Sequence, residues 1–565
     1  MITITDITNW LKTTFGTIDA AQVNEWITFN PKEPILFNTA FFLGLFLLFY
    51  PIYILTTKAK TRVYRHIYVF AFSLFFYYKS SGIYFCLLLF SGLVDYTLAK
   101  FLYEETKEGY RKFFLILSVI FNLSFLGYFK YSNFLIDNYN QLFEGQIHFI
   151  DVILPVGISF YTFQSMSYII DIYRRELEPT KNMLDYMFFV SFFPQLVAGP
   201  IVRASEFIPQ IYSKIQLSRA DFDSAIFLII GGLIKKTVIS DYISLNFVDR
   251  VFDAPKSYTA FENLMASYGY TIQIYCDFSG YSDMAIGIAL LMGFRLSVNF
   301  RTPYQSASIT EFWRRWHISL STWLRDYLYI SVGGNRRGSF GGFLFPSLFF
   351  AGLIAWATWY YPVSPIPLVI AIASLLVFCL TFLLAKDKKR TMFTNVNLMT
   401  TMLLGGFWHG ASLKFIIWGA LHGIALAVNK LFSDYFPTSK DSKFTFWKAI
   451  TTVISVLVTF HFVVFCWIFF RAKDFTVALD MITSIGELQF NWEQWAIVIS
   501  GYENVFIMIA IGYALHFVPA KITQGLKTIF DKLPMLFKAL ILALTFWLVA
   551  AMASSELVPF IYFQF

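Results

Sequence analysis

Two histidines lie in a stretch rich in glycine and tryptophan that is apolar enough to be buried in a membrane. His409 belongs to GGFWHGA at 405–411, and His422 belongs to WGALHG at 418–423. An ionisable side chain at membrane depth costs free energy, so it usually faces a cavity and has a function. Because the sequence shows no obvious ion-transport or redox machinery, this pattern indicates acid–base chemistry on a substrate.

The spacing of the two histidines disfavours a shared metal site. On one unbroken helix, the thirteen residues from His409 to His422 correspond to about 3.6 turns, which places the side chains roughly 140° apart. We therefore expect no metal; one histidine can serve as a base while the other packs or caps. Trp408 and the flanking glycines favour His409 as the functional one.

A second cluster combines aromatic and basic residues in TEFWRRWHISLSTWLRDY at 310–327. Read as a helix, its tryptophans recur at helical spacing and form an aromatic face, beside which lie Arg315 and His317. One interpretation is an interfacial helix whose arginines contact lipid phosphates. The other is a basic wall for an anionic donor, such as a phosphate-bearing thioester carrier. Asp326 lies near the end of the same cluster.

Carboxylates also occur inside an apolar run, in YCDFSGYSD at 275–283. A carboxylate in lipid is expensive, so Asp277 and Asp283 are unlike the serines and threonines nearby, which often bond from helix to helix. For each aspartate, catalysis and a structural ion pair with an arginine are equally good interpretations.

The composition predicts the class of protein that holds these residues. Of 565 residues, 57% are hydrophobic and 14% are charged, whereas soluble domains average about 25% charged residues. Apolar runs of membrane-spanning length recur from residue 37 onward, which indicates an all-α polytopic membrane protein in contact with lipid. The net charge of +8 is typical of cytoplasmic Lys/Arg loops rather than of nucleic-acid binding. The four cysteines are scattered singly, which excludes a CxxC pair.

Candidate spans and loop charges predict the topology. The spans expected are 34–56, 67–78, 82–99, 113–129, 152–172, 187–201, 222–243, 264–292, two within 343–384, 398–428, 449–470, 497–518 and 536–552. Basic loops at 58–65, 100–112 and 174–181 are expected in the cytoplasm, and 131–151, which lacks Lys and Arg, outside. The N-terminus is therefore expected to be extracytoplasmic.

Several motifs, in order along the chain, resemble one known family. They are LPVGISFYTFQSMSYIIDIYR, FFPQLVAGPIVR, QIYCDFSGYSDMAIGIALLMGF, NFRTPYQSASITEFWRRWHISLSTWLRDYLYI, GGNRRG and LLGGFWHGASLKFIIWGALHG, from about residue 154 to 423. The set is similar to the membrane-bound O-acyltransferase (MBOAT) family. Within it, the resemblance is strongest to bacterial alginate and peptidoglycan O-acetyltransferases and to the D-alanyl transfer protein of teichoic acid synthesis.

The resemblance implies a helical bundle with re-entrant helices around a central pore in the cell inner membrane. It implies that His409 is catalytic and that His317 is the second important histidine. Trp408, Arg315, Asp277 and Asp326 are expected to bind substrate in the pore wall. It also implies no bound cofactor, a cytoplasmic acyl-thioester donor, acetyl-CoA in the first instance, and a periplasmic or surface acyltransferase as partner.

One region departs from the family pattern. Between GGNRRG and LLGGFWHG, where a short basic linker is expected, residues 339–397 contain an extra apolar hairpin interrupted by YYPVSP at 360–365. The chain is thus divided into a polar segment (1–33), N-terminal membrane helices (34–150), a catalytic core with the extra hairpin (151–430) and C-terminal membrane helices (431–565).

The function expected is O-acetylation of an exported polysaccharide, alginate-like or another surface glycan. D-alanyl transfer to teichoic-acid-type polymers is a rival that needs a carrier protein. A transporter whose buried histidine relays protons, or a scaffold for a periplasmic acyltransferase, are rivals without an acylation activity. Acyl transfer needs a base for the hydroxyl proton and polarisation of the thioester carbonyl. His409 could supply the base or be acylated transiently.

Overall fold

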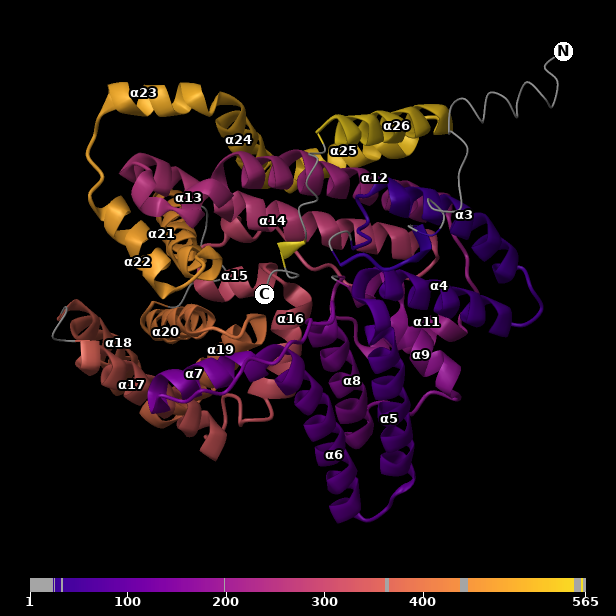
Figure 1. The fold of residues 1–565 in the computed structure, drawn as a ribbon, viewed down its shortest axis with the longest axis horizontal. Helices are drawn as coiled ribbons and strands as arrows, with labels where there is room; N and C mark the ends of the chain where they lie inside the picture. The colour runs from indigo at the N-terminus through magenta and orange to yellow at the C-terminus, as the bar shows by residue number, and fades with distance from the viewer. Residues whose placement is uncertain are drawn as a thin grey trace.

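The computed structural model describes residues 24, 26–31, 34–197, 199–360, 365–436, 446–552 and 560–561. Helices dominate these ranges, and no strand occurs in them (Figure 1). The predicted polar segment 1–33 lies almost wholly outside the described residues. The division of the chain into domains stays a prediction.

The described chain up to residue 253 consists of helices joined by short turns, several of them continuing into π-helical turns. Their bounds are α3 Ala40–Thr57, α4 Val63–Ser81, α5 Phe85–Glu104, α6 Glu108–Leu126, η2 Gly127–Tyr131, α7 Ser132–Phe143, α8 Ile158–Tyr173, α9 Met183–Ser191, α10 Phe193–Leu196, α11 Ala204–Tyr212, α12 Arg219–Leu233, η3 Ile234–Asp241 and α13 Asp249–Asp253. The predicted short span at 67–78 is longer in the structure, where α4 has 19 residues.

The helices after residue 253 include the longest one and two hairpins. Their bounds are α14 Ala260–Leu291, α15 Ile309–Arg315, α16 Ile318–Trp323, η7 Leu324–Tyr329, α17 Phe340–Tyr360, α18 Ile366–Leu383, α19 Lys388–His409, α20 Leu413–Tyr435, α21 Phe446–Arg471, α22 Phe475–Gly486, α23 Trp492–Gly501, α24 Glu503–Phe517, α25 Ala520–Lys532 and α26 Met535–Met552. A capping box of Thr259 and Glu262 begins α14, which lies along α12 (Figure 1).

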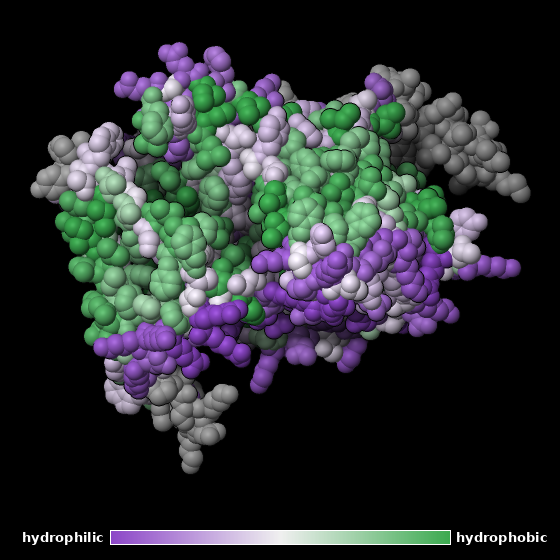
Figure 2. Space-filling view, turned by 90° about the horizontal axis from the view of Figure 1, so that it is seen from below, coloured by the Kyte–Doolittle hydropathy of each residue, from purple (hydrophilic) through white to green (hydrophobic). Residues whose placement is uncertain are grey.

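Several helices are long and apolar enough to cross a membrane. In the described ranges these candidate spans are Ala40–Thr57, Val63–Glu104, Glu108–Phe143, Phe340–Trp359, Leu413–Tyr435, Phe446–Arg471 and Met535–Met552. An eighth would be α23 with α24, which meet at 89°. The surface agrees, because Figure 2 shows hydrophobic residues in a belt bordered by hydrophilic ones. The prediction of an all-α polytopic membrane protein is confirmed, whereas the central pore and re-entrant helices stay predictions.

The predicted single span at 398–428 is wrong, because the chain turns back in its middle. Helix α19 ends at His409, Gly410 is extended with φ −166°, and α20 begins at Leu413. The two helices run antiparallel and touch through Gly406 and Gly419, where an added Cβ would lie 2.2 Å from a carbonyl oxygen of the other helix. This close contact forms a helical hairpin, α19–α20, which we name the catalytic hairpin because it carries His409, the residue expected to be catalytic.

The added hairpin, α17–α18, packs against the catalytic hairpin. Helix α17 lies along α19, and α18 contacts both α19 and α20 (Figure 1). Asn397 of α19 donates hydrogen bonds to the Gly334 and Arg337 carbonyl oxygens, at 2.9 and 3.0 Å, just before α17. The apolar insertion expected at 339–397 therefore forms two helices beside the stretch that carries His409.

Candidate active site

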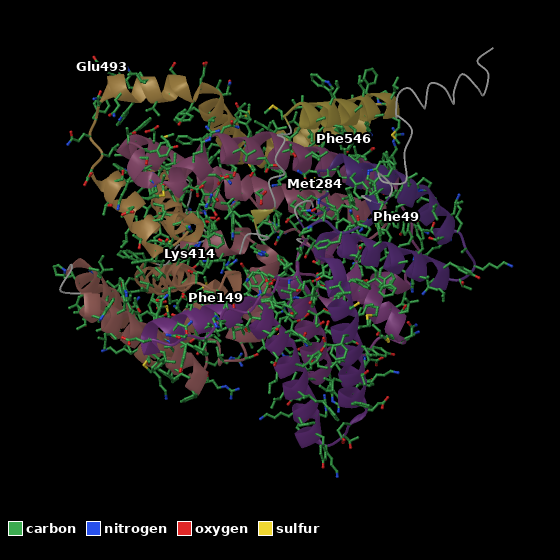
Figure 3. All side chains as sticks on the ribbon, viewed as in Figure 1. Phe49, Phe149, Met284, Lys414, Glu493 and Phe546 are labelled. Carbon is green, nitrogen blue, oxygen red and sulfur yellow. The ribbon has the colours of Figure 1, made fainter. Side chains whose placement is uncertain are left out.

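His409 is the last residue of α19 and is buried, with 3% of its surface exposed. Three aromatic rings meet its imidazole edge to face. The ring centroids of Trp408, Trp418 and Phe470 lie 5.0, 5.1 and 5.3 Å from that of His409. Lys414, labelled in Figure 3, donates to the Ala472 carbonyl just past α21 and so ties the start of α20 to the helix of Phe470.

The end of α19 is held by two residues from the N-terminal part of the chain. Lys130 Nζ donates to the carbonyl oxygens of Trp408 and His409 at 2.8 and 2.9 Å, and the Tyr131 hydroxyl donates to the Phe407 oxygen at 2.9 Å. The last carbonyls of a helix have no partner within it, and a cation there is favourable. Sequence reasoning missed this clamp of Lys130 and Tyr131, although a lysine directly after the predicted span 113–129 was a signal.

His317 is fully buried at the start of α16, in the left-handed region with φ 43°. Its Nδ1 lies 3.2 Å from Asn299 Oδ1, which also accepts from the backbone N–H and hydroxyl of Ser319, at 3.2 and 2.9 Å. Because that atom accepts from a backbone N–H, it is an oxygen, and His317 Nδ1 must donate to it. Neutral His317 therefore carries its lone pair on Nε2.

Trp408 lies between the two histidines. Its ring centroid is 5.0 Å from that of His409 and 6.4 Å from that of His317. The structure thus brings three of the six predicted site residues, His409, His317 and Trp408, into one cluster of packed aromatic rings, which we call the chamber.

Asp277 forms a buried ion pair. Its Oδ1 lies 2.6 Å from Lys236 Nζ, and its Oδ2 accepts from the Ile561 backbone N–H at 3.0 Å. Of the two interpretations of Asp277, catalysis and a structural ion pair, this geometry fits the ion pair, with a lysine in place of the expected arginine. Its neighbour Phe278 contacts the His317 ring at 4.6 Å, so this ion pair supports the wall behind His317.

Arg315 and Asp326 occupy separate places. Arg315 pairs with Glu311 one turn earlier on α15, at 2.5 Å. Asp326 pairs with Arg203 and with Arg325, whose Nε lies 2.6 Å away, and its carbonyl accepts from Arg174 at 3.1 Å.

Arg174 and Arg203 both lie over the ring of Tyr327, at 5.4 and 5.5 Å from its centroid. Burial alone would raise the pKa of the Asp326 carboxyl, but hydrogen bonds from Arg325 and Arg203 outweigh it and hold the pKa below its ordinary value. Asp326 is therefore ionised at neutral pH and organises an arginine cluster of Arg174, Arg203 and Arg325. Sequence reasoning missed the first two of these arginines.

A column of packed aromatic rings connects the arginine cluster to the histidines. Trp408 stacks on Phe163 at 5.1 Å, Phe163 stacks on Trp323 at 3.8 Å, and Trp323 contacts Tyr327 at 5.3 Å. Trp323 Nε1 also donates to the Phe163 carbonyl at 3.0 Å. Helix α8 runs beside this column, and its 16 residues correspond to about 24 Å.

His422 lies in an aromatic cage rather than beside His409. Its ring centroid is 4.8 to 6.0 Å from those of Trp418, Trp313, Phe462 and Phe312. Neither ring nitrogen has a hydrogen-bond partner among the described residues. No group of three or more His, Cys, Asp or Glu side chains suited to a metal ion occurs in the described ranges.

Comparison with known proteins identifies the family. The model of the membrane-bound O-acyltransferase family matches residues 113–349, which include His317 and end before His409. The chain is 35% identical to the peptidoglycan O-acetyltransferase of Helicobacter pylori over 79% of each chain. It is 35% identical to the probable alginate O-acetylase AlgI of Pseudomonas putida, over 82% of this chain and 86% of that one. It is 26% identical to the teichoic acid D-alanyltransferase of Bacillus subtilis, over 57% of this chain and 69% of that one. The chain belongs to the MBOAT family and is an acyltransferase of its O-acetyltransferase type.

Proposed function

We propose that this protein transfers acetyl groups from acetyl-CoA in the cytoplasm toward an exported cell-surface polysaccharide, with His409 as the catalytic residue. The observation that carries the proposal is the burial of His409 at a clamped helix end, in one chamber with His317 and Trp408. The names of the relatives support acetyl as the group transferred and a polysaccharide as the acceptor.

The chemistry follows from the groups in the chamber. The acceptor hydroxyl gives its proton to the His409 imidazole while its oxygen attacks the thioester carbonyl carbon. The carbon–sulfur bond breaks, the thiolate leaves, and the imidazolium returns a proton to it. His317 presents the lone pair of Nε2, because Nδ1–H donates to Asn299. Since the attacking hydroxyl gives its one proton to His409, His317 orients the acceptor by accepting a hydrogen bond from a neighbouring hydroxyl.

The arginine cluster is suited to the donor. Guanidinium groups bind phosphates through paired hydrogen bonds, and Arg174 and Arg203 lie together at the end of the aromatic column remote from Trp408. The loop at 174–181 is one of those expected in the cytoplasm. The acetyl group would then approach His409 from the cytoplasmic side, and a periplasmic or surface acyltransferase would complete delivery to the polymer.

The test is the ester content of the surface polysaccharide in cells that make wild-type protein, His409→Ala or His461→Ala, at matched membrane levels. His461 is the control because it is exposed on α21. We expect His409→Ala to reduce the ester to background and His461→Ala to leave it unchanged. Retained ester in His409→Ala would refute the catalytic role and favour a scaffold. Release of D-alanine instead of acetate by mild base would refute acetyl transfer.

The donor site has its own test in purified protein. Arg174→Gln removes a guanidinium that donates hydrogen bonds to the Asp326 carbonyl and the Ser331 hydroxyl, so the pair of Arg203 and Asp326 stays intact. We expect KM for acetyl-CoA to rise by about five- to tenfold with kcat little changed, since one charge-assisted contact is worth about 1 kcal/mol or more. An unchanged KM would place the donor elsewhere.

A further inference from the structure

A cavity of about 500 Å³ lies between the added hairpin and the catalytic hairpin. Helices α7, α17, α19, α20 and α22 form its walls, and every residue that lines it is apolar or glycine. Such a volume is within the range of small-molecule sites, roughly 300–1,000 Å³. Water needs two to four polar partners to remain in a cavity, so these walls favour hydrocarbon over water.

The cavity is continuous with the surface that meets the bilayer. Leu348 of α17 and Leu413 of α20 line it and are 60% and 54% exposed, and both helices are candidate membrane spans. Figure 2 shows the hydrophobic belt to which such surfaces belong. No lining residue carries a charge, so the cavity matches the uncharged tail of a lipid and not its head group.

The inner wall of the cavity is the turn of α19 that leads to His409. Phe407 lines the cavity, its ring stacks on Tyr131 at 4.2 Å, and its carbonyl accepts from the Tyr131 hydroxyl. A lipid tail in the cavity would therefore press on the clamp of Lys130 and Tyr131 that holds the end of α19. Helix α17 supplies much of the opposite wall of the cavity. That opposite wall therefore exists only in a protein that has the added hairpin.

We propose that the cavity binds one acyl chain of a membrane phospholipid, held by the added hairpin against the helix that carries His409. This lipid is a resident part of the structure and is distinct from the acetyl donor and the polysaccharide acceptor. The inference does not rest on the proposed function, since it follows from the cavity walls and the membrane spans.

A larger side chain at position 352 would fill the cavity without a clash at its Cβ. Gly352 lines the wall, and an added Cβ there would meet no atom within 4 Å. Gly341 is the matched control, because it lies on the same helix, is equally open to a Cβ, and is not part of the cavity wall. Gly352→Phe should place a ring where the acyl chain lies, and Gly352→Leu is a smaller variant for the same purpose.

In the experiment, the full-length protein is purified in detergent, and its bound lipid is exchanged for a nitroxide-labelled phosphatidylglycerol. The measurement is how much of the label is motionally restricted by the protein. We expect the number of motionally restricted labelled lipids per protein to fall by about one in Gly352→Phe and Gly352→Leu. In Gly341→Phe this number should stay at the wild-type level. Equal restricted fractions in wild type and both Gly352 variants would overturn the proposal. Mass spectrometry that finds a polyisoprenoid in place of phospholipid in the wild type would overturn the assignment of the occupant.

Discussion

The catalytic hairpin and the added hairpin lie side by side but differ in how many of their glycines are closely packed. In α19–α20 the glycines bring two backbones into contact, so an added Cβ at Gly406 would lie 2.2 Å from the Phe415 carbonyl oxygen. In α17 the glycines at 341 and 352 face open space, whereas an added Cβ at Gly342 would lie 2.2 Å from the Asn397 side chain of α19. The hairpin that carries His409 is packed backbone to backbone, whereas α17 leaves two of its glycines loosely packed.

The largest expected effect comes from a methyl group at the backbone contact. Gly406→Ala would force α19 and α20 apart, and overpacking of this kind costs about 1–3 kcal/mol or more. We expect less folded protein in the membrane, read from blots and from the thermal midpoint in detergent. Gly405→Ala is the control, because its Cβ meets only the end of the Leu324 side chain, at 3.1 Å. Equal behaviour of the two variants would contradict the contrast between the hairpins.

The clamp on α19 should matter more for activity than for folding. Lys130→Met keeps the length of the side chain but removes the donor to the Trp408 and His409 carbonyls. Two hydrogen bonds of about 0.5–1.5 kcal/mol each are lost, so we expect acetylation to fall about tenfold. Ester content at matched protein level is the measurement, with Lys130→Arg as the variant that keeps a cation. Full activity in Lys130→Met would show that hairpin packing alone positions His409.

A smaller effect is expected at the residue that fixes the tautomer of His317. Asn299→Ala removes the acceptor for Nδ1–H, so the imidazole can present either nitrogen to the chamber. We expect kcat to fall about five- to tenfold, as for loss of one oriented hydrogen bond of about 1 kcal/mol. Ser319→Ala controls for the other bonds of this network, since it leaves the bond between Asn299 and His317 in place. A reduction as large in Ser319→Ala would assign the effect to local folding.

The smallest effect is expected in the added hairpin. Gly352→Ala puts a methyl group into open space and removes a flexible residue from a helix, which stabilises by about 0.5–1 kcal/mol. Activity should be unchanged, because a methyl group is too small to displace a chain from the cavity. The thermal midpoint and the ester assay check this. A loss of stability would show that α17 is packed as closely as α19.

The sequence predicted what depends on composition and on local motifs. Apolar runs identify most of the membrane helices, and the histidine and tryptophan motifs at 310–327 and 405–411 supply residues that meet in the chamber. The motif at 405–411 lies at the end of one helix, whereas the stretch at 310–327, which we read as one helix, breaks at His317 between α15 and α16. The role of each residue in catalysis stays a prediction.

The rest depends on contacts between distant parts of the chain. Lys130 and His409 are 279 positions apart, and no periodicity links them. The turn at Gly410 was also missed, because hydropathy continues through it, although a glycine after the last helical residue and Ser412 before the next helix are stop and start signals. The close contact of Gly406 with Gly419 exists only after folding. Asp277 was recognised as costly to bury, but its partner Lys236 could be named only from the fold.

The contacts of residues 560–561 imply an order in which parts of the protein are completed during synthesis. Phe560 packs on Phe278 and Tyr281 with ring centroids 5.4 and 4.8 Å apart, next to the ion pair that receives the Ile561 N–H. Phe278 in turn contacts His317. Chains are synthesised from the N-terminus and their parts fold as they emerge, so the wall behind His317 is completed after the membrane helices before residue 553 have been made. A nascent protein therefore carries His409 and His317 before the wall behind His317 is complete.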